Sequence, residues 1–121
     1  MLRGIVVQGD GFGRGLGYPT ANLNVHPTEV KFAVGVYAAE AVLRDSVYYG
    51  ALVINDNPWK VEVYFINYTG PDFYGEEIRV SPIQKVSQLE HYDSVDELKE
   101  KIAIDVRLVN EFFAERTARK K

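Results

Sequence analysis

The ten residues Trp59–Tyr68, WKVEVYFINY, alternate between two kinds of side chain. The odd-numbered positions begin with large apolar residues: Trp59, Val61, Val63 and Phe65. The even-numbered positions begin with a more polar set: Lys60, Glu62, Tyr64 and Ile66. A repeat of two residues is the pattern of a β-strand with one face in a core. We therefore expect a strand here, with Glu62 on the face opposite the apolar one, so that its charge need not be buried in the core.

Short stretches of the same kind run through most of the chain. Strand patterns also occur at Gly4–Gln8, Gly35–Leu43, Tyr48–Ile54, Glu76–Val80 and Gln84–Leu89. Polar, turn-forming segments separate several of them, at 44–46 and 69–72. Short strands spaced by turns are typical of a closed or nearly closed antiparallel barrel. The sequence therefore predicts a mainly β fold.

The C-terminal part of the chain has a different period. Ser94 and Glu97 have the spacing of a capping box, in which the serine is the N-cap of a helix. Apolar residues then recur at three- and four-residue steps: Val95, Leu98, Ile102, Val106, Val109 and Phe113. We expect one amphipathic helix packed on the barrel. Its basic tail, 116–121, complements the negative end of the helix and is more simply a solvated end than a nucleic-acid site.

Composition limits the possible functions. The 121 residues are enough for one domain, 1–121, and carry 14 Lys and Arg against 17 Asp and Glu. The slightly negative charge argues against broad attraction to nucleic acid or anionic membranes. The sequence has no cysteine, which excludes disulfides and thiolate sites, and its apolar runs are too short to span a bilayer. With no room for a signal peptide after Met1, we expect a cytoplasmic monomer.

Five glycines occupy alternate positions in the stretch Gly9–Asn22, GDGFGRGLGYPTAN. No register gives the dinucleotide motif G-x-G-x-x-G, and no Gly-Lys-Ser/Thr follows as in a Walker phosphate loop. Glycines alone are most simply a flexible connection between strands. Thr20 and Asn22, however, are two apart, so in extended backbone their oxygens leave the same face and suit Mg²⁺ that already carries nucleotide phosphates. Arg14 can neutralise those phosphates.

Several motifs, taken together and in order, resemble riboflavin kinase. They are G-x-V-x-x-G at Gly4–Gly9, G-R-G-L-G-x-P-T-A-N at Gly13–Asn22, Asn57-Pro58, V-E-V at Val61–Val63 and D-F-Y-G-E at Asp72–Glu76. The resemblance covers nearly the whole chain. It implies a six-stranded antiparallel Greek-key barrel with a C-terminal helix packed on it. It also implies transfer of a phosphoryl group from ATP to riboflavin, giving FMN and ADP.

The resemblance assigns roles to particular residues. Thr20 and Asn22 would hold the divalent metal, Mg²⁺ or alternatively Zn²⁺ or Mn²⁺, and touch ATP. Glu62 would be the catalytic base, although without the family context it is more simply a solvated strand glutamate. The residues expected over the phosphates are Gly9, Gly11, Gly13, Arg14 and Gly15. Those expected around the adenine are Phe65 and Asn67, through backbone atoms, and Tyr74.

Three positions on the expected flavin side depart from the family pattern. Ser87 stands where relatives usually have arginine, Glu90 where lysine or another hydrogen-bonding residue is common, and Tyr92 where phenylalanine is usual. Lys85 is a nearby cation that could compensate for the arginine. The departures leave open the alternative that the protein is a flavin- or nucleotide-binding module that has lost catalysis. The intact Glu62 argues against this alternative, because a module that only binds has no need of a base. No nucleotidyltransferase His-x-Gly-His motif occurs in the sequence.

Overall fold

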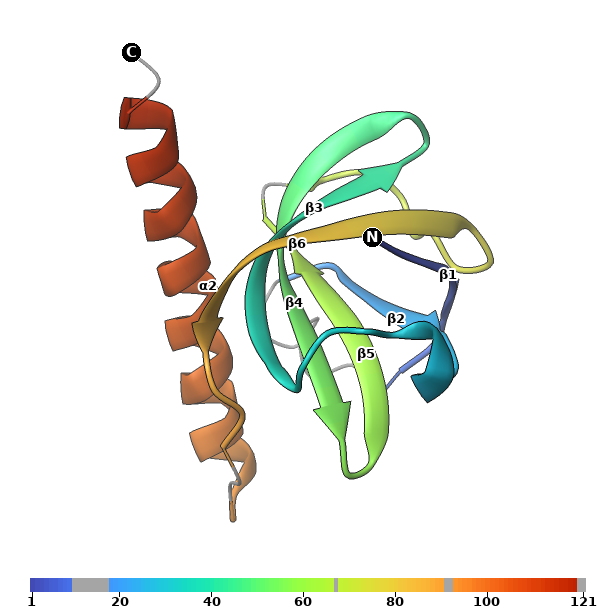
Figure 1. Cartoon of the computed structure of the whole chain (residues 1–121), viewed down its shortest axis with the longest axis horizontal. Coiled ribbons are helices and arrows are strands. Elements are labelled where there is room, and N and C mark those ends of the chain that lie inside the picture. Colours follow the sequence, from blue (N-terminus) through green and yellow to red (C-terminus); the bar gives the residue numbers. More distant parts are fainter. Residues whose placement is uncertain (10–17, 67, 91–92, 120–121) are drawn as a thin grey trace.

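The computed structural model describes residues 1–9, 18–66, 68–90 and 93–119. These residues form a barrel of strands with a long helix standing along one side (Figure 1). The strands are β1 (Leu2–Val7), β2 (Thr20–Asn24), β3 (Gly35–Leu43), β4 (Ser46–Asp56), β5 (Trp59–Phe65) and β6 (Glu77–Ser87). A short 3-10 helix, η1 (Pro27–Glu29), precedes β3, and the long helix is α2 (Val95–Arg119).

The strands close into a barrel in the order β1-β2-β5-β4-β3-β6, and every neighbouring pair is antiparallel. Strands β3, β4 and β5 are successive hairpins, and β6 returns to pair with β3. This order, 6-3-4-5, is a Greek key. Within the described residues the predicted six-stranded antiparallel barrel with a C-terminal helix is confirmed.

The elements differ from the predicted ones mainly at β2, which was not among the predicted strand patterns, and at β6. Strand β3 has the predicted bounds, but the two segments expected at Glu76–Val80 and Gln84–Leu89 are one strand, Glu77–Ser87. Pro82, between the two predicted segments, lies opposite Ala39, where the register with β3 shifts. Such a bulge accommodates a residue that cannot donate to the ladder.

Two apolar cores lie on opposite sides of the barrel wall. The first fills the barrel and includes Val6, Leu52, Val63, Phe65 and Val80. The second lies between the outside of the barrel and α2, and includes Val36, Tyr64, Ile102, Val106, Val109 and Phe113. The predicted amphipathic helix is therefore confirmed, except that Val95 is 48% exposed. Its N-cap is also confirmed, because the backbone N–H of Glu97 donates to Ser94 Oγ at 3.2 Å.

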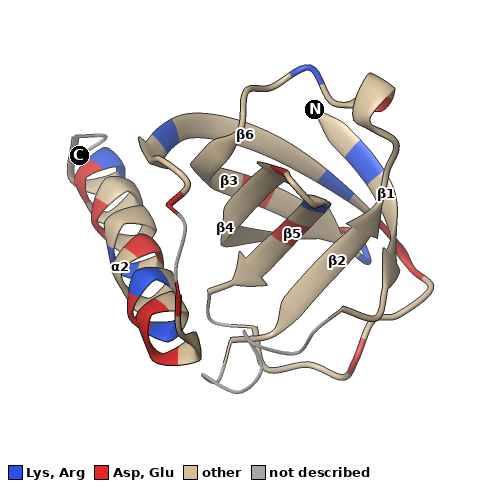
Figure 2. Ribbon diagram, turned by 90° about the horizontal axis from the view of Figure 1, so that it is seen from below, with Lys and Arg blue, Asp and Glu red and all other residues tan. Residues whose placement is uncertain are grey.

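Charged residues are distributed unevenly over these elements (Figure 2). Both acidic and basic residues are spread along α2, whereas β2 carries no charged residue. The helix meets the barrel along β3, β4 and β6. At that contact the ring of Tyr49 stacks on Phe113, with ring centroids 3.8 Å apart.

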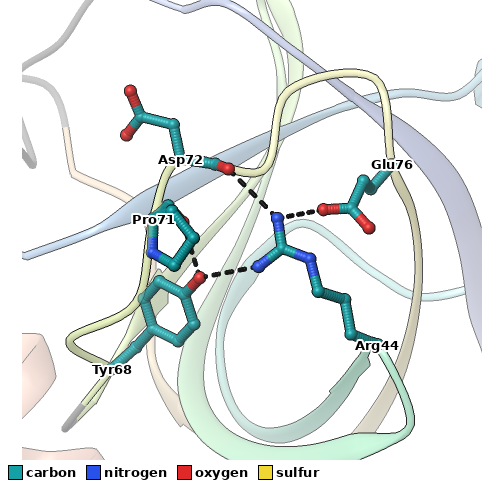
Figure 3. A network of polar contacts seen from close by, with 5 residues as sticks. All are labelled: Arg44, Tyr68, Pro71, Asp72 and Glu76. Carbon is teal, nitrogen blue, oxygen red and sulfur yellow. Dashed lines mark hydrogen bonds and ion pairs between the residues drawn. The ribbon is translucent and has the colours of Figure 1, made fainter.

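Arg44 ties the loop before β6 to the β3–β4 turn (Figure 3). Its guanidinium donates to Tyr68 Oη and to the carbonyl of Asp72, both at 3.1 Å, and forms an ion pair with Glu76. Hydrogen bonding to Glu76 raises the pKa of Arg44 above its ordinary value. Arg44 and Asp45 have φ of 50° and 66°. Positive φ at both residues is the hairpin geometry that matches the twist of the flanking strands.

Candidate active site

The pairing of β2 with β5 brings three of the predicted site residues together. Asn22 is the cross-strand partner of Glu62, and Thr20 is the partner of Tyr64. Ala21, between them on β2, lies in the barrel core. Because successive side chains of a strand point to opposite faces, Thr20, Asn22 and Glu62 lie on the outer face of the barrel.

Glu62 is buried, at 6% exposure, although the alternation of the sequence left its face outside the barrel core. Glu62 belongs to neither apolar core, as the alternation indicated, but α2 covers part of this outer face, so Glu62 is not a solvated strand glutamate. Tyr64, two residues along on the same face, belongs to the core beneath α2. Tyr64 Oη donates to Glu62 Oε1 at 2.9 Å, and Lys60 Nζ lies 3.6 Å from Glu62 Oε2. Oε1 therefore accepts a hydrogen bond from Tyr64, whereas Oε2 lies only within ion-pair distance of Lys60.

The two predicted metal ligands have oxygen atoms suited to a hard cation. Thr20 is buried, and its hydroxyl donates to the carbonyl of Tyr18 at 3.0 Å, which leaves the oxygen lone pairs as acceptors. Asn22 is half-buried and offers an amide oxygen. Hydroxyl and amide oxygens fit Mg²⁺, which keeps several waters and binds substrate phosphates. The described residues contain no group of three or more His, Cys, Asp or Glu side chains placed to hold a metal.

Gly9 lies directly against the side chain of Asn22. A Cβ at this position would overlap the Asn22 amide group. Any larger residue at position 9 would therefore require the Asn22 amide group to move.

A cavity of about 210 Å³ lies between β3–β5 and the first half of α2. Glu62 lines it from the barrel, together with Lys60 and Tyr64. Its apolar walls are Val36, Val53, Pro58, Leu89, Leu98 and Ile102. The remaining lining residues are Asn55, Glu90, Lys101 and Asp105. Glu90 is exposed at the edge of the cavity.

Sequence reasoning missed two charged residues of this cavity. Lys101 Nζ contacts both Asp105 and the hydroxyl of Ser87, and Asp105 is 4% exposed. Burial raises the pKa of Asp105, while hydrogen bonding to Lys101 opposes that rise. The signal was present in the sequence, because both positions fall at three- or four-residue steps from the apolar residue Leu98 or Ile102. The cation beside Ser87 is therefore Lys101, whereas Lys85 lies over Gly35.

The other predicted residues lie apart from the cavity or outside the described residues. The ring of Phe65 is in the barrel core, and its backbone N–H donates to the carbonyl of Pro19 at 2.8 Å. Tyr74 is 41% exposed on the loop before β6. The predicted site residues outside the described part are Gly11, Gly13, Arg14, Gly15, Asn67 and Tyr92.

Residues 1–113 match the flavokinase (riboflavin kinase) family. The chain belongs to the riboflavin kinase family. A bifunctional riboflavin kinase/FMN adenylyltransferase of Escherichia coli K12 is 34% identical over an alignment of 119 positions, which covers 93% of this chain and 37% of that protein. An RNA-binding riboflavin kinase, RibR, of Bacillus subtilis is 28% identical over 93% of this chain and 51% of its own length. The chain thus spans about a third to a half of these relatives.

The fold of this riboflavin kinase family member is also found in a crystal structure of riboflavin kinase from Trypanosoma brucei. The TM-score is 0.67 at 24% identity, covering 98% of this chain and 79% of the other. No helix within the described ranges is long and apolar enough to cross a membrane. The cytoplasmic location, the monomeric state and the absence of a nucleic-acid partner stay predictions.

Proposed function

We propose that this chain is a kinase domain that transfers the γ-phosphoryl group of ATP to the 5′-hydroxyl of riboflavin, giving FMN and ADP. The observation that carries the proposal is the position of Glu62. This carboxylate is the cross-strand neighbour of Asn22 on β2 and also lines the cavity beside α2. It therefore adjoins both a surface suited to metal-bound phosphates and a space suited to an organic acceptor.

Glu62 is the proposed general base. The riboflavin hydroxyl gives its proton to Glu62 while its oxygen forms the new bond to the γ-phosphorus. The bond from that phosphorus to the β–γ bridging oxygen breaks, and ADP leaves with the electron pair. Such transfers depend on positioning and on stabilisation of spread negative charge. The hydrogen bond from Tyr64 and the ion pair with Lys60 hold the carboxylate in place for this step.

Thr20 and Asn22 are the proposed ligands of Mg²⁺, with Zn²⁺ and Mn²⁺ as alternatives. The bound ion would neutralise phosphate charge. The residues proposed to cover the phosphates are Gly9, Gly11, Gly13, Arg14 and Gly15. Those proposed around the adenine are Asn67, Tyr74 and the backbone carbonyl of Phe65, since the ring of Phe65 faces the barrel core.

The cavity beside α2 is the proposed acceptor site. Its 210 Å³ is below the ~300–1,000 Å³ of most ligand pockets, so part of the flavin would project beyond it. The apolar side chains of Val36 and Val53 from the barrel, and of Leu98 and Ile102 from α2, suit the two faces of a flat ring.

The decisive experiment measures FMN formation from riboflavin and Mg-ATP by chromatography. Glu62→Gln keeps the shape and removes the base, so turnover should fall by ~10²–10⁴-fold while Mg-ADP binding survives. Glu77→Gln is the matched control. Glu77 lies on β6, and its exposed side chain pairs with Arg3 on β1, away from the cavity. Near-normal turnover in Glu62→Gln would show that Glu62 is not the base. No FMN from the wild type with saturating substrates and Mg²⁺, Mn²⁺ or Zn²⁺ would favour a binding module.

A further inference from the structure

Three polar side chains form a cluster on the α2 side of the cavity. Lys101 and Asp105 come from α2 and are an ion pair one helical turn apart. The Lys101 ammonium also contacts Ser87 Oγ at the end of β6. Only 11% of the Lys101 side chain and 6% of the Asp105 side chain are exposed. The pair is thus removed from bulk water but borders the proposed acceptor site.

Helix stability does not explain this pair. Removing an ion pair from water costs free energy, and the attraction between the two charges often does not offset that cost. Apolar residues of similar size therefore commonly stabilise the fold equally well. A lysine four residues before an acid is also the less favourable order on a helix. Arg107 and Glu111 have the same order on α2 but are exposed, at 68% and 61%, and lie 4.0 Å apart. The buried pair occupies positions where the helix could have continued its apolar stripe.

The chemistry of the cluster selects a particular kind of ligand group. An ammonium has three donors, and among the described residues its hydrogen-bond partners are Asp105 and Ser87. One donor of Lys101 therefore remains for an acceptor in the cavity, and the Asp105 carboxylate accepts hydrogen bonds. Because the two charges cancel, the pair favours neither a free anion nor a free cation. It fits a neutral group with a carbonyl next to an N–H, such as an amide or a cyclic imide.

We propose that Lys101 and Asp105 bind the imide edge of the flavin ring, with Lys101 donating to a ring carbonyl and Asp105 accepting from the imide N–H. This inference rests on the proposed function, which places riboflavin in the cavity. The ring would enter with its pyrimidine edge toward Lys101 and Asp105, and its ribityl chain would run to Glu62 on β5. Both charged groups are specificity determinants for the acceptor and take no part in phosphoryl transfer.

The test combines a ligand change with a protein change. The ligands are riboflavin and riboflavin methylated at the imide nitrogen N3. Their equilibrium dissociation constants are measured with Mg-ADP saturating, so that binding is read separately from FMN formation. One lost hydrogen bond to a charged group weakens binding by about ten- to a hundredfold. Methylation should therefore weaken binding to the wild type by about that factor.

The protein change is Lys101→Met combined with Asp105→Leu, which keeps the volume and leaves no unpaired charge. This variant should bind riboflavin about ten- to a hundredfold more weakly, with kcat nearly retained. The dissociation constants of the two ligands for this variant should also differ by less than about threefold, because the side chains that hydrogen-bond the imide are gone. The exposed pair provides the control, since Arg107→Met with Glu111→Leu should leave both dissociation constants unchanged.

Three outcomes would overturn the proposal. The first is that the wild type binds both ligands with equal dissociation constants. The second is that the wild type binds neither ligand. Neither of these outcomes requires a variant. A variant that loses the same factor for both ligands would show that the cluster only joins α2 to β6. A wild type that binds riboflavin and rejects the methylated ligand, yet forms no FMN, would refute the proposed function and leave the imide contact standing.

Discussion

At the residue scale, Gly9 shows how the lack of a side chain leaves room for a neighbouring one. Its backbone occupies the space beside the Asn22 amide, and a Cβ would overlap that group. Glycine here allows a close approach and does not serve a left-handed turn. The stretch of alternate glycines thus contributes at least one residue whose smallness serves the proposed metal site directly.

We expect Gly9→Ala to weaken the proposed metal site through Asn22. The added methyl group displaces the amide, and misplacement by ~1 Å can cost ~10²-fold in rate. The apparent Mg²⁺ requirement for FMN formation, measured by titration, should therefore rise, as in Asn22→Ala. Asn24→Ala, two residues along the same strand face, should leave it unchanged.

A double-mutant cycle separates this effect from general damage. In the Asn22→Ala background there is no amide to displace, so Gly9→Ala should add little. Additive losses would show that Gly9 and Asn22 act independently, and that Gly9 does not place the Asn22 amide.

At the element scale, Arg44 connects segments that are far apart in the sequence. It belongs to the tight β3–β4 turn, and its guanidinium contacts three residues of the 68–76 loop (Figure 3). Tyr68, one of the three, donates its own hydroxyl proton to the carbonyl of Pro71 at 2.6 Å. The loop that carries Tyr74, proposed to lie near the nucleotide, is therefore fixed by polar contacts on the far side of the barrel from α2 (Figure 1).

Arg44→Gln should loosen this loop without unfolding the barrel. The change removes the ion pair and most of the forked donors, which a glutamine amide cannot replace. Hydrogen exchange should speed up at the amides of Gly75 and Glu76, which donate to the carbonyls of Val6 and Phe73 in the folded loop. Amides in the middle of β4 should exchange as before, because local opening leaves the ladder intact.

Arg3→Gln is the matched control for Arg44. Arg3 also pairs with a glutamate, Glu77, but at 3.8 Å and with both side chains more than half exposed. Such surface pairs contribute little. Two results would contradict the assigned role of Arg44. The amides of Gly75 and Glu76 could exchange equally fast in both variants, or their exchange rates could be unchanged in Arg44→Gln.

At the scale of the whole molecule, the sequence predicted the barrel and the helix but not the surface between them. The alternation predicted that Glu62 and Val63 face opposite sides of the barrel wall. In the structure Val63 lies in the barrel core, and Glu62 lies on the outer face beside Asn22. It could not show that the outer face would be covered, because burial by α2 depends on contacts between segments some forty residues apart. For the same reason the helical period alone did not single out Lys101 and Asp105, although they border the cavity.

The two cores also suggest that the helix and the barrel differ in stability. The cluster inside the barrel and the cluster under α2 share no residue, and the helix is held at one side only. A unit with fewer buried contacts opens at a lower free energy than the whole fold. We therefore expect α2 to leave the barrel before the barrel itself unfolds, which would open the proposed acceptor site while leaving β2 and β5 paired.

Val109→Ala and Val80→Ala test this separation, since both valines are 0% exposed and lose the same two methyl groups. Each change should cost about 1.5–3 kcal/mol in the core that contains it. Native-state hydrogen exchange should show Val109→Ala lowering the opening free energy of α2 amides alone. Val80→Ala should lower that of the β1, β3 and β6 amides. Riboflavin should restore protection of α2 in Val109→Ala, because its proposed site exists only with the helix in place. Equal acceleration of helix and barrel amides by Val109→Ala would mean that the chain opens as one cooperative unit.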